Sequence, residues 1–174
     1  MKKTILLSLL SSSLLLSQTS NAGEWAIGGL IGQGSTDFCD FVTGFNCDDS
    51  DTSFGINLSY DFSKSWGVEL GYTDLGDAEI SAPGFGSASA SFDAIHLAGT
   101  GTVNFSDSWS LTGRLGVADL SGDAQGFSES ETGLFAGASL NYNFNDNLQA
   151  QLRYESFDGD ADNFALGLKY SFGK

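Results

Sequence analysis

A strict alternation of apolar and polar residues runs through most of this sequence and restricts what it can fold into. From Phe54 to Phe62 every second residue is large and apolar, and the residues between them are small or polar. The same two-residue period flanks three short polar turns, which begin at Phe62, Phe105 and Phe144. Successive side chains of a β-strand point to opposite faces, and helical spacing fits none of these segments. The pattern therefore predicts strands with one apolar face and one polar face.

Eight such strands follow one another, and the connections between them alternate in length. Short turns alternate with longer connections at residues 35–51, 76–91, 119–131 and 158–162. An even number of antiparallel strands of about 9–13 residues, with short turns at one end and longer loops at the other, is typical of bacterial outer-membrane barrels. Lipid cannot bond an open strand edge, so such a sheet has to close. We therefore expect an all-β, eight-stranded antiparallel up-and-down transmembrane β-barrel over residues 23–174.

A soluble eight-stranded barrel is the alternative, and its apolar face would line the interior. A soluble exterior carries roughly 25–35% charged residues, whereas the polar face here consists mainly of Gly, Ser, Ala, Thr and Asn. Small side chains of this kind suit the crowded interior of a narrow barrel. Aromatic residues also gather at the strand ends beside the short turns, as in the belts at membrane boundaries: Trp25, Phe62, Trp66, Phe105, Trp109, Phe144 and Phe172. Both features favour the membrane barrel.

Residues 1–22 have the layout of a secretory signal peptide. Lys2 and Lys3 precede an apolar stretch diluted with Ser, and small residues precede an expected cleavage after Ala22. The apolar stretch is short for a spanning helix, although an N-terminal anchor helix is the alternative. Exported proteins can form disulfides. We therefore predict a disulfide between Cys39 and Cys47 in the first long connection, with two free thiols as the alternative.

Charge and composition restrict the classes of function. The chain has 22 acidic and 7 basic residues and a net charge of −15, so it offers no basic surface for the phosphates of a nucleic acid. One His and two Cys supply too few ligands for the usual buried metal sites, and we predict no metal and no cofactor. His96 is the one candidate base for a Ser-His-Asp group, and no G-x-S-x-G motif accompanies it. We therefore predict that the chain is not an enzyme.

Five charged residues fall on the face predicted to line the lumen. Counted along their strands, they occupy a slab about 10 Å deep. Opposite walls of a narrow barrel lie within side-chain reach, and buried charges need partners. We therefore predict an ion-pair network in the lumen that comprises Glu69, Arg114, Arg153, Glu155 and Lys169. The simplest interpretation is a polar filling of the barrel interior.

The layout of the whole chain also resembles a known family. The eight strands, the short turns bracketed by Phe and Trp, and the ending Gly167-Leu-Lys-Tyr170-Ser-Phe172 resemble the OmpA/OmpX-like (opacity-type) outer membrane β-barrel family. The resemblance implies the outer membrane of a Gram-negative bacterium, with contact to the lipid bilayer and to lipopolysaccharide. Gly167, Tyr170 and Phe172 resemble the signal that the outer-membrane assembly machinery reads. We expect a monomer.

Two functions are consistent with such a barrel. The first is a structural or surface-interaction role, in which the loops contact a host surface or another part of the envelope, with the ligand unknown. The second follows from the resemblance, which implies a small, porin-like, low-conductance channel gated by the lumen ion pairs. An eight-stranded lumen is normally filled by side chains, and this weighs against the channel.

Overall fold

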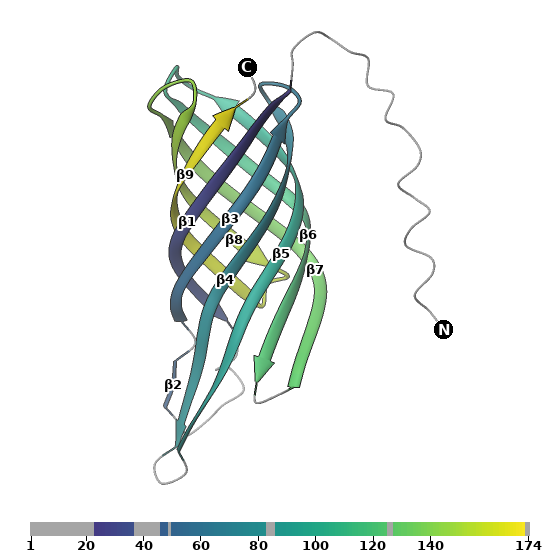
Figure 1. Cartoon of the computed structure of the whole chain (residues 1–174), viewed down its shortest axis with the longest axis vertical. Coiled ribbons are helices and arrows are strands. Elements are labelled where there is room, and N and C mark those ends of the chain that lie inside the picture. Colours follow the sequence, from purple (N-terminus) through teal and green to yellow (C-terminus); the bar gives the residue numbers. More distant parts are fainter. Residues whose placement is uncertain (1–22, 37–45, 49, 83–85, 125–126, 173–174) are drawn as a thin grey trace, which may run out of the picture.

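The computed structural model describes residues 23–36, 46–48, 50–82, 86–124 and 127–172, and these form one closed barrel (Figure 1). Every strand pairing is antiparallel, and the sheet closes where the first long strand pairs with the last, from Trp25↔Phe172 to Thr36↔Ala161. The strands are β1 (Glu24–Thr36), β2 (Asn46–Asp48), β3 (Ser50–Asp61), β4 (Trp66–Ala82), β5 (Gly86–Asn104), β6 (Trp109–Ala124), β7 (Phe127–Asn143), β8 (Leu148–Phe157) and β9 (Ala161–Phe172). Eight of them build the barrel wall, which confirms the predicted fold class, and β2 is a short addition to β4.

The predicted signal peptide, residues 1–22, lies outside the described residues and stays a prediction. Within the described residues, the structure contains no helix with the length and apolar character that crossing a membrane requires.

The two faces of the alternation point to opposite sides of the wall. Outward-facing Leu70 is 50% exposed, whereas its inward-facing neighbour Glu69 is 2% exposed. Exposed aliphatic side chains continue around the outer surface on every long strand and form an apolar belt. Soluble proteins rarely expose a continuous apolar surface of this extent, because its contact with water is unfavourable. The belt is therefore the surface that contacts the hydrocarbon of a membrane.

The three repeated turns share one hydrogen-bonding pattern. In each, the residue after the Phe accepts bonds from two backbone amides of the turn through its side-chain oxygen. Ser63 Oγ accepts from Ser65 and Trp66, and the side chains of Ser106 and Asn145 do the same in their turns. Side chains of Ser and Asn favour such turns because they can replace a backbone partner locally. The turns lie at the end of the barrel where β1 begins and β9 ends, at the top of Figure 1.

Exposed aromatic residues mark that end as a membrane boundary. Trp25 packs against Tyr60 with ring centroids 4.8 Å apart, and Trp109 packs against Tyr142 at 4.9 Å. Their rings lie on the outer surface at the edge of the apolar belt, together with Trp66 and Phe172. Aromatic rings favour this position because one part contacts hydrocarbon while the other contacts the polar interface.

Two of the connections that the sequence predicts as long loops are mainly strand. The pairing of β4 with β5 continues from Gly76↔Phe92 to Ala82↔Gly86, and that of β6 with β7 continues to Ala124↔Phe127. The eight wall strands consequently reach lengths of up to 19 residues, against the 9–13 expected. Both hairpins extend well beyond the rest of the barrel at the bottom of Figure 1.

A β-bulge explains why the alternation does not predict that β4 continues into the hairpin. The register of β4 and β5 shifts between Asp74 and Gly76, and Gly76 has a φ of 86°. The extra residue, Leu75, moves the inward positions from odd to even numbers, so that Ala78 faces inward as Thr73 does. A bulge inserts one residue in one strand and interrupts the two-residue period that a sequence pattern depends on.

The last predicted loop is also shorter than expected. Asp158, Gly159 and Asp160 form the whole connection between β8 and β9. Asp158 has a φ of 55° and Gly159 a φ of 82°, a left-handed backbone that Asp and Gly adopt more readily than other residues.

The orientation of the wall can be tested with arginine substitutions on its two faces. Leu70→Arg places a charge at the middle of the apolar belt and should lower the free energy of unfolding by about 2–4 kcal/mol. Thr102→Arg points toward the polar interior near the barrel mouth, where a guanidinium group stays hydrated, and should cost clearly less. Urea unfolding in lipid vesicles measures both. Equal losses would show that the two faces are assigned wrongly.

Candidate functional site in the barrel lumen

Four of the predicted lumen charges meet in one buried cluster. Arg114 Nε donates to Glu69 Oε1 over 2.9 Å, and Arg153 bonds the same oxygen. Arg153 Nη2 also lies 2.6 Å from Glu155 Oε1. These side chains come from β4, β6 and β8, and all four are at most 5% exposed. Two positive and two negative charges therefore balance each other across the lumen.

Neutral polar side chains add further hydrogen bonds to this ionic layer. Arg114 Nη1 donates to Ser139 Oγ over 2.8 Å, and Asn163 Nδ2 donates to Glu155 Oε2 over 2.9 Å. Ser53 Oγ in turn donates to Asn163 Oδ1 over 2.6 Å. Buried ion pairs recover their desolvation cost only when further hydrogen bonds satisfy the charged groups. Among the described residues, Nε and Nη1 of Arg153 have no hydrogen-bond partner. The cluster connects strands on several sides of the barrel.

Lys169, the fifth residue of the predicted network, lies apart from this cluster. Its Nζ contacts Asp61 Oδ2 over 3.1 Å, and both side chains are partly exposed. Asp61 ends β3 on the inward face, beside the barrel mouth, and therefore offers Lys169 a nearer carboxylate than Glu69. Asp61 is not among the predicted partners, although it lies on the same face of β3 as the inward-facing Asn57 and Ser59.

An apolar layer lies directly against the ionic layer. The ring of His96 stacks on that of Phe135, with centroids 4.0 Å apart and planes 9° apart. Phe157 packs against Phe135 at 5.4 Å. Phe135, Phe157 and Leu75 are at most 3% exposed and belong to one cluster with four buried alanines, and Phe92 and Leu120 pack against it. The alternation assigns Phe135 to the inward face but gives no sign that aromatic side chains fill the lumen there.

His96 joins the two layers. Its Nε2 lies 3.5 Å from Glu69 Oε1, while its ring stays within the aromatic cluster. The contacts described for His96 include no hydroxyl group that it could activate. Its position is that of a lumen side chain with one polar contact.

On the short-turn side of the ionic layer the lumen opens into a polar vestibule of about 780 Å³. Glu69 and Arg114 line its inner end, and the three short turns surround its mouth. Short polar side chains cover most of the wall between them, including Ser59, Thr100, Thr102, Ser110, Thr112 and Gln151. The barrel is therefore open to water from the short-turn end and is closed in its middle by an ionic and then an apolar layer.

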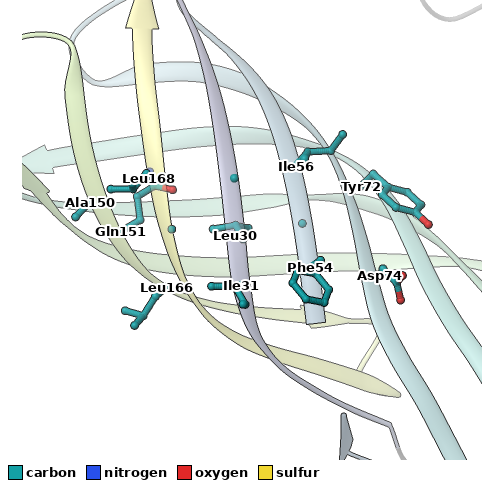
Figure 2. Close-up of a pocket in the computed structure, with 13 residues that line it drawn as sticks. Leu30, Ile31, Phe54, Ile56, Tyr72, Asp74, Ala150, Gln151, Leu166 and Leu168 are labelled. Carbon is teal, nitrogen blue, oxygen red and sulfur yellow. The ribbon is translucent and has the colours of Figure 1, made fainter. Parts of the chain in front are cut away.

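A second hollow lies on the outer surface, away from the lumen (Figure 2). It is a groove of about 880 Å³ around the outward-facing Gly29, and its walls are mostly apolar. Ile31, Phe54, Ile56, Leu166 and Leu168 line it. These residues belong to the exposed apolar belt, so the groove is part of the surface that faces lipid.

The predicted disulfide and the predicted assembly signal both stay predictions. Cys39 lies outside the described residues, so the disulfide with Cys47 stays a prediction. Tyr170 and Phe172 are exposed on the outer face of β9, and Gly167 pairs with Leu30 on the neighbouring strand. Their role as an assembly signal also stays a prediction.

Comparison with solved structures finds the same fold in several bacterial outer membrane proteins. OprG from Pseudomonas aeruginosa superimposes with a TM-score of 0.67 at 18% identity, over 88% of this chain and 97% of that one. The N-terminal barrel domain of Pseudomonas aeruginosa OprF gives 0.58 at 12% identity, over 87% and 100%. Ail, the attachment invasion locus protein of Yersinia pestis, solved with the heparin analogue sucrose octasulfate, gives 0.53 at 22% identity, over 87% and 98%.

No curated protein matches the sequence. The sequence profile of one family, the outer membrane protein beta-barrel domain, matches residues 4–172. This match covers nearly the whole chain, and it agrees with the closed antiparallel barrel, the apolar belt and the polar lumen. The chain belongs to the outer membrane protein beta-barrel domain family and is a protein of the Gram-negative outer membrane.

Proposed function

We propose that this protein is a closed scaffold with a structural and surface-interaction role, in adhesion to a host or in envelope contact, and that its extracellular hairpins and loops make the contacts. The observation that carries the proposal is the filled lumen. An ion that enters the vestibule meets the paired charges of Glu69 and Arg114 and then the rings of Phe135 and Phe157. Dry aromatic layers exclude ions because a charge loses its hydration there.

The charge of the loop end supports a role in surface contact. Residues 35–51, 76–91, 119–131 and 158–162 contain many acidic residues and no Lys or Arg. Burial raises the pKa of Asp93, which lies just beyond the apolar belt, and neighbouring carboxylates raise it further: Asp123, Asp74 and Asp119. A surface this acidic favours cationic partners, or anionic lipopolysaccharide reached through a bridging divalent cation. It disfavours a sulfated polyanion of the kind bound to Ail.

The small channel gated by lumen ion pairs is the alternative function. The pair of Glu69 and Arg114 lies at the inner end of a water-accessible vestibule, where a gate would have to lie. Breaking that pair alone leaves the apolar layer in place. The channel therefore requires two separate rearrangements, whereas the scaffold requires none.

Conductance in planar bilayers distinguishes these functions. The wild-type protein and Glu69→Gln should both show no steady channel, because the aromatic layer remains closed. Glu69→Gln combined with Phe135→Ala and Phe157→Ala should conduct, since both layers are then opened. Steady conductance of the Glu69→Gln variant alone would favour the gated channel over the closed scaffold.

The ionic layer should show energetic coupling across the lumen. Glu69→Ala leaves two guanidinium groups without a shared partner and should lower the free energy of unfolding by about 3–5 kcal/mol. Arg114→Ala in the same chain should recover part of this loss, with a coupling energy of about 0.5–3 kcal/mol. Urea unfolding in lipid vesicles gives the double-mutant cycles of Glu69 with Arg114 and with Arg153. Coupling near zero in both cycles would contradict a layer held by these pairs.

Surface contact can be tested by shortening one hairpin. Ser121 and Ser130 are paired in β6 and β7, so an Asn-Gly turn can replace residues 122–129 while the register is kept. Whole cells with the shortened protein should bind less to host matrix and to one another than cells with the wild type. Lys64→Ala, in a turn at the opposite end, is the matched control and should change neither. Unchanged binding after each extracellular hairpin is shortened in this way would contradict the proposal.

A further inference from the structure

Among the described residues, one edge of β7 has no strand beside it where the hairpin extends beyond the rest of the barrel. β7 pairs with β6 from Phe127 onward, whereas its pairing with β8 begins at Phe135. Within the part of the chain that the structure describes, residues 128–133 therefore have a strand neighbour on one side only. Figure 1 shows the β6–β7 hairpin continuing past the turn between β8 and β9.

Asp158 marks the point where this free edge begins. Its backbone amide donates to the carbonyl of Leu134 over 2.7 Å, and its Oδ1 accepts from the amide of Leu134 over 3.1 Å. These bonds satisfy the backbone of Leu134 on the side that β8 occupies from Phe135 onward. Since alternate residues of a strand direct their amide and carbonyl groups to the same side, the backbones of Thr132 and Ser130 face the free edge.

The side chains around the edge are acidic. Glu129 and Glu131 are exposed on β7, as are Asp119 and Asp123 on the adjacent β6. Asp158 and Asp160 are exposed in the turn at the base of the edge. Residues 115–152 contain no Lys or Arg. A second copy of this chain would bring like charges together at the edge, which is unfavourable, whereas a basic segment would be attracted to it.

We propose that residues 128–133 of β7 are a docking edge for an extended, cationic peptide segment of a partner protein, which adds to the sheet as a further strand. The backbone groups of Ser130 and Thr132 supply hydrogen bonds that do not depend on the partner's sequence, and the carboxylates of Glu129 and Glu131 select for positive charge. The inference deepens the proposed surface-interaction role and rests on it.

The probe for the test is an eight-residue peptide of alternating Lys and Thr, bound to the full barrel in lipid nanodiscs and measured by calorimetry. A peptide of the same sequence with N-methylated backbone amides along both edges keeps the charge and cannot donate backbone hydrogen bonds. On the protein, Ser130→Pro removes one amide from the free edge, and Ser130→Ala is the matched variant that keeps it. Unchanged heat-dependent gel mobility shows that each variant is a folded barrel.

We expect the unmodified peptide to bind to the wild type and to Ser130→Ala with the same affinity. Ser130→Pro and N-methylation should each weaken binding about tenfold, because backbone hydrogen bonds are lost. Glu129→Gln with Glu131→Gln should weaken binding and reduce its salt dependence.

Two results would overturn the docking edge. One is equal binding of the N-methylated and unmodified peptides, or equal binding by Ser130→Pro, because acidic charge alone would then hold the peptide and the wider surface-contact role would stand. The other is the absence of binding to the wild type. The cell-binding experiment with the shortened hairpin uses no peptide, so it decides the wider role separately.

Discussion

In hydrocarbon no water is present to bond the amide and carbonyl groups of a strand edge, and the rest of this structure depends on that constraint. Each unpaired group would cost several kcal/mol, so β1 has to pair with β9 along its length, and it does so from Trp25 to Thr36. Closure with eight strands leaves a narrow interior. Narrowness in turn explains why the inward positions are mostly small, and why the few large ones, Arg153 and Phe135 among them, meet in the middle.

The interior has a layered order that follows from the same geometry. Charged side chains from opposite walls come within bonding distance, so Glu69 can serve both Arg114 and Arg153. Aromatic rings fill the next level, where Phe135 and Phe157 pack together and are almost completely buried. The vestibule on the short-turn side is lined mainly by short polar residues and stays open to water. A barrel of this width can thus be closed by a handful of side chains, without a separate plug domain.

The sequence predicts the wall of this barrel well and its contents only in part. Strict alternation assigns the two faces of residues such as Glu69 and Leu70 because the strand period is two. The alternation fails at Leu75, where a bulge shifts the phase and hides the continuation of β4 into the hairpin. The alternation also does not show how far along the barrel axis an inward-facing side chain lies. It therefore assigns Lys169 to the central network, whereas the partner of Lys169 is Asp61 at the mouth. For the same reason it does not show that Phe135 and Phe157 lie at one level.

Outside the membrane the sheet no longer has to close, and at that boundary the closed barrel gives way to open hairpins. Water can bond the free amides and carbonyls of an edge, so β6 and β7 continue as a two-stranded hairpin after β8 has ended at Phe157. Open edges invite pairing with other chains, and dense negative charge is a common protection because it repels further copies of the same protein. Glu129 and Glu131 supply that charge beside the edge of β7. The same carboxylates that keep two copies apart attract a basic strand, so protection against self-association and selection of a partner are consequences of one arrangement of charge.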